Sequence, residues 1–182
     1  MIWWIIGTAV VIVALVFFSY YNRFVTLKNR IENSMAQINV QLKKRADLVP
    51  NLLESVKGYM KHEKSIIAEV TKARKEMMAA GNINKKVAAN NKMESALKSI
   101  FALAENYPNL KANENFLQLQ QEMSAIEDKV AYSRQYYNDN IMSFNTLSQI
   151  IPGIWFAKMY GFAGKKYLEI TEAEKAMPKI KF

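Results

Sequence analysis

Residues 1–18 read MIWWIIGTAVVIVALVFF, and this stretch decides how the rest of the chain is organised. It contains no charged side chain, and the first one in the sequence is Arg23. About 20 apolar residues, at about 1.5 Å per residue, span the hydrocarbon core of a bilayer. Aromatic residues, which settle at the two membrane interfaces, flank the run: Trp3, Trp4, Tyr20 and Tyr21. Residues 1–21 are therefore predicted to form a transmembrane helix.

The alternative for this segment is a cleaved signal peptide. Such a peptide has basic residues before its apolar stretch and small residues at a cleavage site after it. Nothing basic precedes Ile2, and residues 17–24, FFSYYNRF, offer no site of that kind. We therefore expect a retained, single-pass anchor.

The charges that follow the anchor predict its orientation. Basic residues occur only on its C-terminal side: Arg23, Lys28, Arg30, Lys43, Lys44 and Arg45. The positive-inside rule then places the N-terminus outside and the C-terminal domain in the cytoplasm, at the inner membrane of a bacterial cell. The absence of cysteine fits a reducing compartment. A periplasmic domain remains the alternative.

Beyond the anchor, apolar residues recur three and four positions apart in four series, within residues 24–42, 49–77, 87–104 and 116–147. Such stripes are typical of helices packed in bundles and coiled coils. No stretch alternates with period two for long enough to form a strand. We therefore predict an all-α protein, with the transmembrane helix continuous with an elongated antiparallel four-helix bundle over residues 22–151.

Helix-breaking residues lie between the series. Asp47 is predicted to cap a second helix whose first turn contains Pro50, so the first helix would run from Ile2 to Ala46. Gly81 follows the second series as a C-terminal stop. Tyr107–Pro108 ends the third, and Pro152–Gly153 ends the fourth. Short connections make successive helices antiparallel, so the fourth should end near the bilayer.

The C-terminal segment, residues 152–182, begins with large aromatic side chains and interleaved lysines. Rings at the head-group level and ammonium groups near phosphate are typical of an interfacial segment. With the flanks of the anchor, the candidate membrane-interface residues are Trp3, Trp4, Tyr20, Tyr21, Arg23, Trp155, Phe156, Lys158, Tyr160, Phe162, Lys165 and Lys166. We predict that residues 154–167 contact lipid. The alternative is that their aromatic side chains cap the open end of the bundle, and both can hold for different faces.

The groups that enzymes use are scarce in this sequence. There is no cysteine, and His62 is the only histidine. His62 and Glu63 do not start a zinc-protease motif, because Ile66 stands where the second histidine is needed. Residues 161–167, GFAGKKY, lack the spacing and the Ser or Thr of a phosphate-binding loop. We expect no catalytic residues, no metal and no cofactor.

The net charge of +9 lies entirely beyond the anchor and predicts the partners. A basic domain tethered to a bilayer faces anionic lipid, each nearby basic residue contributing about 1 kcal/mol. Nucleic acid is not expected, because the basic groups at residues 43–45 and 72–75 are short, and no binding motif occurs. Such clusters are usually solvated or complement a helix dipole. Scattered carboxylates such as Glu54, Glu105, Glu122 and Glu127 fit solvated faces paired with nearby lysines.

Amide side chains are unusually frequent on the first and fourth predicted helices. They are Asn33, Gln37, Asn39, Gln41, Asn113, Asn115, Gln118, Gln120 and Gln121. Amides at a helix interface fix register and partner number, which favours side-to-side assembly into a homo-oligomer. The alternative for any single amide is exposed helix surface.

Two long stretches of this sequence, residues 21–74 and 112–145, closely resemble the LemA family of bacterial membrane proteins. The resemblance extends over essentially the whole chain, including YPNLKANENF at residues 107–116 and the closing PKIKF. It implies an N-terminal transmembrane helix, a short outer N-terminus and a cytoplasmic helical bundle. It implies no catalytic residues. A magnetosome membrane protein belongs to this family, which suggests a role in organising or shaping membrane.

The function hypothesis is a non-enzymatic, membrane-anchored helical protein that self-assembles or scaffolds partners at the membrane. The partners expected are membrane lipid, further copies of the chain and a membrane protein. The alternative is an accessory or regulatory subunit of a membrane-bound enzyme or protease complex. An enzyme that uses helix carboxylates is a third hypothesis, and it requires a bound metal.

Overall fold

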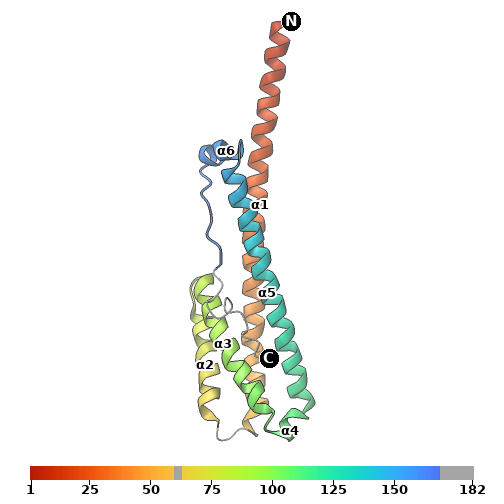
Figure 1. Ribbon diagram of the computed structural model, residues 1–182, viewed down its shortest axis with the longest axis vertical. Helices are drawn as coiled ribbons and strands as arrows, with labels where there is room; N and C mark the ends of the chain where they lie inside the picture. Colours follow the sequence, from red (N-terminus) through yellow and green to blue (C-terminus); the bar gives the residue numbers. More distant parts are fainter. Residues whose placement is uncertain (60–62, 169–182) are drawn as a thin grey trace, which may run out of the picture. The chain divides into compact units, whose positions relative to one another are not determined.

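The computed structural model describes residues 1–59 and 63–168, and every regular element within them is a helix. In chain order (Figure 1) these are α1 Ile2–Lys57, α2 Lys64–Ala79, α3 Ile83–Ala104, α4 Pro108–Lys111, α5 Glu114–Gln149 and α6 Gly153–Tyr160. The all-α prediction is confirmed, including the N-terminal apolar helix that continues into the rest of the fold. Met60, His62 and residues 169–182 lie outside the described residues.

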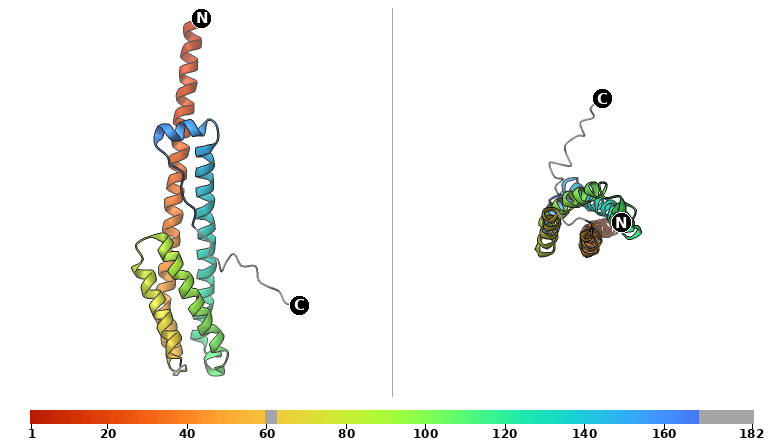
Figure 2. Two further views of the ribbon diagram at one scale, coloured as in Figure 1. Left: turned by 60° about the vertical axis from the view of Figure 1, so that its left-hand side comes forward. Right: turned by 90° about the horizontal axis from the view of Figure 1, so that it is seen from below.

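The described chain packs as two compact units, and α1 and α5 contribute to both. The first unit comprises Met1–Met35 and Arg134–Leu168, and the second comprises the described part of Ala36–Ser133. In the second unit, α2 and α3 lie side by side with segments of α1 and α5 (Figure 2). Its apolar core includes Ile38, Leu42, Val49, Leu52, Val56, Val70, Met77, Val87, Met93, Leu97, Ile100, Phe116, Met123 and Val130. Members of all four predicted stripes therefore reach this core.

The predicted helix break at Asp47 and Pro50 is wrong, because α1 continues through Pro50 to Lys57. A proline inside a helix leaves the carbonyl four residues earlier without its N–H partner. Here that carbonyl belongs to Ala46, and it accepts a hydrogen bond of 2.7 Å from Nε of Arg74 on α2. The apolar face of α1 also stays buried across the proline. A tertiary contact and core packing thus keep the helix continuous.

In the first unit, α1 packs against the second half of α5. The two helices meet through buried residues at the spacing predicted from the sequence: Phe24, Leu27, Ile31, Tyr137, Ile141, Phe144 and Leu147. The rings of Phe24 and Phe144 are 5.6 Å apart and nearly perpendicular, which is a favoured aromatic geometry. This pairing positions the end of α5 and everything that follows it.

Local capping fixes several helix ends. The side chain of Asn82 accepts a hydrogen bond from the N–H of Lys85 at the start of α3. Asn113 does the same for Phe116 at the start of α5, as N-cap residues do. At the α5–α6 corner, a side chain on Gly153 would collide with the carbonyl oxygen of Leu147. Glycine is therefore required where α6 begins, and the predicted end of the fourth helix at Pro152–Gly153 is confirmed.

Candidate membrane-interface site

The N-terminal part of α1 presents its apolar side chains to the outside. Trp3 and Trp4 are 81% and 83% exposed, and none of the apolar segment of this helix is buried. Within the described chain, α1 alone is long and apolar enough to cross a membrane. Apolar surface of this extent on a helix requires a non-aqueous surrounding or a partner. The protein therefore carries one candidate membrane span near the N-terminus.

Helix α6 folds back onto α1 where this apolar segment ends (Figure 2). The hydroxyl Oη of Tyr160 donates a 2.8 Å hydrogen bond to the carbonyl oxygen of Phe17. The ring of Tyr160 lies 5.1 Å from that of Phe17 and 5.3 Å from that of Tyr21. The ring of Phe156 stacks on Tyr20 at 4.8 Å. One face of α6 thus forms an aromatic cluster with residues 17–21.

The chain then leaves α6 through a left-handed glycine. Gly161 has φ 71°, and the N–H of Phe162 donates to the carbonyl of Ala157 at 2.9 Å, a Schellman-type C-terminal cap. This turn places the ring of Phe162 on Phe24, with their centroids 4.9 Å apart. The aromatic cluster therefore extends from α6 into the core between α1 and α5.

Two asparagines on α5 hold the extended segment that follows. The amide of Asn145 accepts from the N–H of Lys165 at 2.8 Å and donates to the carbonyl of the same residue at 2.9 Å. Asn138 makes the same pair of bonds with Leu168, at 2.9 and 3.2 Å. The two asparagines are seven residues apart and so share one face of the helix. They bind backbone only, and they fix residues 165–168 along α5.

Replacing both asparagines by alanine should release this segment. The N138A/N145A variant loses four hydrogen bonds, each contributing about 0.5–1.5 kcal/mol. We expect the amides of Lys165 and Leu168 to exchange at least about tenfold faster with deuterium, since 1.4 kcal/mol is a factor of ten. The control is N115A/Q121A, two exposed amides on the same helix. Equal exchange in both variants would contradict the role of these asparagines.

The opposite face of α6 is exposed. Trp155 and Met159 are 63% and 58% exposed, and Ile151 just before the helix is 73% exposed. Trp155 and Met159 are four apart in α6 and so lie on one face of it, and Ile151 adds exposed apolar surface just before the helix. Lys158 is exposed in the same turn. The short helix α6, for which the sequence left both lipid contact and capping of the bundle open, therefore has one aromatic face that is packed and one apolar face that is exposed.

The predicted interface residues fall into three groups. Tyr20, Tyr21, Phe156, Tyr160 and Phe162 come together in the aromatic cluster. Exposed side chains are those of Trp3, Trp4, Arg23, Trp155, Lys158 and Lys166. Lys165 is half-buried, with Nζ 5.5 Å from the centre of the Phe144 ring. Trp3 and Trp4 lie about 25 Å along the helix from Tyr20. The capping alternative thus applies to one face of α6, and lipid contact stays a prediction for the other.

Sequence reasoning missed several residues that build the site. Phe17 and Phe24 were part of the anchor and of the first stripe, and nothing in their spacing shows that α6 covers them. Asn138 and Asn145 were not singled out, although their seven-residue spacing on one helix face was a usable signal. Gly153 was assigned only to a helix break.

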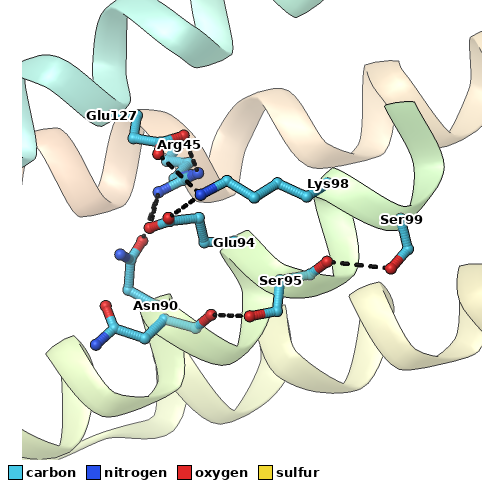
Figure 3. Close-up of polar contacts among 8 residues, drawn as sticks. Arg45, Asn90, Glu94, Ser95, Lys98, Ser99 and Glu127 are labelled. Atoms are coloured by element: carbon cyan, nitrogen blue, oxygen red, sulfur yellow. Dashed lines mark hydrogen bonds and ion pairs between the residues drawn. The ribbon is translucent and has the colours of Figure 1, made fainter. Parts of the chain in front are cut away.

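A polar cluster lies in the core of the second unit (Figure 3). Arg45 of α1 is 2% exposed and forms ion pairs with Glu94 of α3 at 3.6 Å and Glu127 of α5 at 3.4 Å. Asn90 accepts a hydrogen bond from the same guanidinium at 3.3 Å. Lys98 closes the cluster from its exposed side, 2.7 Å from Glu94 and 3.3 Å from Glu127. The interpretation of residues 43–45 as a solvated basic group is therefore wrong for Arg45.

The charges in this cluster keep Glu94 ionised. Burial alone would raise the pKa of its carboxyl group, but the hydrogen bond with Lys98 and the charges of Arg45 and Lys98 outweigh that effect and lower the pKa. The hydrogen bond to Glu94 raises the pKa of Lys98 in turn. An ionised, fully paired carboxylate is a poor general acid or base near neutral pH. No cluster of three metal-binding side chains occurs in residues 1–59 and 63–168.

Comparison with known proteins identifies the family. The family model described as the LemA family matches residues 34–182. The chain is 27% identical over 129 residues to Protein LemA of Metamycoplasma hominis, covering 69% of this chain and 58% of that protein. It is 22% identical over 173 residues to the Magnetosome protein MamQ of Magnetospirillum gryphiswaldense, covering 81% of this chain and 64% of the relative.

A further relative is Magnetosome protein MamQ 2 of Paramagnetospirillum magneticum, 22% identical over 175 residues, with 82% of this chain and 64% of the relative covered. The chain thus spans less than two thirds of the length of these relatives, and none of their names is that of an enzyme. The family match begins at Ser34, after the apolar segment, and includes the second unit, α5, α6 and the segment held by Asn138 and Asn145. The chain belongs to the LemA family.

Proposed function

We propose that this protein is a non-enzymatic, membrane-anchored scaffold that self-assembles at the inner face of a bacterial membrane. The observation that carries the proposal is the short helix α6, which has an exposed apolar face and is bound by Tyr160 to Phe17 at the end of the apolar segment of α1. Because α6 is fixed there, the exposed apolar surface of Ile151, Trp155 and Met159 lies where the bilayer ends if α1 spans it. The protein then has two membrane attachments, one spanning and one interfacial.

The distribution of charge along the chain supports a cytoplasmic location for the part that follows the anchor. Every charged side chain lies beyond Asn22, and the basic ones begin at Arg23, which favours a cytoplasmic location for the rest of the chain. The chain has no cysteine, so a single K44C substitution can report its side. In intact cells a membrane-impermeant maleimide should leave this cysteine unmodified until the inner membrane is opened. Labelling in cells whose outer membrane alone is permeable would place the domain in the periplasm instead.

Assembly is supported by exposed amides on α1 and α5. Asn33, Gln37, Asn115, Gln120 and Gln121 are all exposed, although others act within the chain. Asn113 caps α5, and Asn39 accepts a hydrogen bond from Lys86. Exposed amides can pair across copies through hydrogen bonds. The names of two relatives contain the word magnetosome, which is compatible with a role at membranes.

The depth of Trp155 tests the interfacial attachment. The chain has three tryptophans, so a W3F/W4F variant leaves Trp155 as the only one. In vesicles, lipids brominated near the head group should quench its fluorescence more strongly than lipids brominated at the chain ends. Quenching by an aqueous quencher alone would contradict lipid contact.

Self-assembly has its own measurement. Crosslinking and sedimentation of the full chain in detergent should reveal species larger than one chain, increasing with concentration. A strictly monomeric chain at every concentration, with no crosslinked neighbour, would contradict the scaffold proposal.

A further inference from the structure

A groove of about 560 Å³ lies between α1 and α5 within the first unit. Leu27 and Leu147, both buried, lie at its base, and Arg23 and Arg30 line it on the α1 side. Arg23 is five residues beyond Phe18, so it lies about 7.5 Å further along the helix. The head-group layer is about 5–8 Å thick on each side of the hydrocarbon core. If α1 spans the bilayer, the groove therefore begins at head-group depth.

The groove carries positive charge that no carboxylate in its lining balances. Arg23 and Arg30 are seven residues apart and lie on one face of α1. No Asp or Glu lines the groove, and neither guanidinium forms an ion pair within residues 1–59 and 63–168. Lys28, between them in sequence, is paired with Glu32 at 3.9 Å. The two arginines are thus free to bind an external anion.

The remaining lining has two chemical characters. Thr26 and Thr146 contribute hydroxyl groups, which can donate to a phosphate oxygen. Met142 and Ile150, 53% and 46% exposed, add apolar surface along the α5 side. A free inorganic anion would leave that apolar surface in water. A glycerophospholipid covers the part of this surface nearest the membrane with its glycerol and the first part of its acyl chains. Its phosphate lies at the level of Arg23, and the long side chain of Arg30, about 10.5 Å further along α1, extends toward it.

We propose that this groove binds the phosphate of an anionic glycerophospholipid, with Arg23 and Arg30 as the recognising residues. Guanidinium groups bind phosphate through paired hydrogen bonds, which a lysine cannot reproduce. The proposal rests on the anchoring of α1 proposed above. It is separate from the contact made by α6, because the groove is lined by α1, by α5 and by Ile150 just after α5, and no residue of α6 lines it.

Native mass spectrometry of the full chain in detergent tests this proposal, with phosphatidylglycerol and phosphatidylcholine as the two added lipids. We expect wild type to retain phosphatidylglycerol in preference to phosphatidylcholine. The R23Q/R30Q variant should bind phosphatidylglycerol about thirtyfold more weakly, as expected for losing two basic contacts. The R23K/R30K variant keeps the charge and should fall between them. The matched control K28Q/K44Q removes two exposed charges outside the groove and should lose less than about threefold.

Three outcomes would overturn the proposal. The first is equal retention of the two lipids by wild type. The second is equal loss in R23Q/R30Q and K28Q/K44Q, which would show a diffuse charge effect. The third is displacement of phosphatidylglycerol by excess inorganic phosphate, which would make a free anion the ligand. Carbonate extraction of cell membranes tests the anchor separately. If carbonate releases the wild-type protein from the membrane, the proposed anchoring of α1 is wrong, whatever lipid the groove binds.

Discussion

Replacing Arg45 by alanine should lower the free energy of unfolding of the second unit by about 3 kcal/mol. Removing one partner from a buried ion pair costs about 3–5 kcal/mol, because the charge left behind loses its compensation. Glu94 and Glu127 are 23% and 37% exposed and keep Lys98, so the lower end of that range applies. The truncation also leaves a cavity at a fully buried position. Denaturant unfolding of the full chain in detergent, followed by circular dichroism, measures the change.

Two further variants show whether the cost of R45A comes from the lost charge or the lost volume, and whether it depends on burial of the charge. R45M keeps most of the side-chain volume and should cost less than R45A. K98A removes the other cation of the cluster, which is 63% exposed, and should cost less than about 1 kcal/mol. If K98A were as destabilising as R45A, burial of Arg45 would not be what makes its charge important.

The same cluster should contribute to acid sensitivity. The pKa of Glu94 in the folded chain lies below its ordinary value of 4.5. Its charged form is therefore favoured by folding, and this contribution is complete above about pH 4.5 and lost as the pH falls through the folded pKa. In E94Q that contribution is absent at every pH, so stability should decrease less steeply below pH 4.5 than in wild type. A wild-type slope in E94Q would show that other carboxyl groups cause the acid dependence.

Periodic features of this fold could be predicted because they depend on local sequence. The charge-free run at residues 1–18 and the four apolar stripes are properties of neighbouring residues. The structure places the run in an exposed helix and most members of the stripes in the core, as expected. The resemblance to the LemA family implied the same architecture, an N-terminal transmembrane helix followed by a helical bundle. The return of the fourth helix toward the anchor followed from short connections, and the Tyr160–Phe17 hydrogen bond of the first unit agrees with it.

Features that depend on distant partners could not be predicted in this way. Arg45 is in a run of three basic residues, which usually indicates exposure, and its partners are 45 to 82 positions away. Asn90 and Glu94 are polar residues within the third apolar stripe. Only the structure shows that both bind Arg45. Arg74 likewise interrupted the second stripe, yet its side chain serves a carbonyl group on another helix.

Replacing Pro50 by alanine should stabilise the second unit. Proline inside a helix costs about 3 kcal/mol relative to alanine, through its missing N–H and the clash of its ring with the carbonyl of Ala46. Part of that cost is already offset, because Arg74 donates to this carbonyl. We therefore expect P50A to raise the free energy of unfolding by about 1–2 kcal/mol. The measurement is again denaturant unfolding of the full chain in detergent.

A double-mutant cycle shows whether Arg74 compensates for Pro50. In wild type, R74M should cost about 1–3 kcal/mol, since the carbonyl of the fully buried Ala46 loses its partner. In the P50A background residue 50 supplies its own N–H, so R74M should cost at least about 1 kcal/mol less. K75M, one position along and exposed, should cost the same in both backgrounds. If the effects of R74M and P50A are additive, packing alone keeps α1 helical across Pro50. If they are coupled, the side chain of Arg74 supplies the hydrogen bond that the carbonyl of Ala46, 28 residues away, lacks because of Pro50.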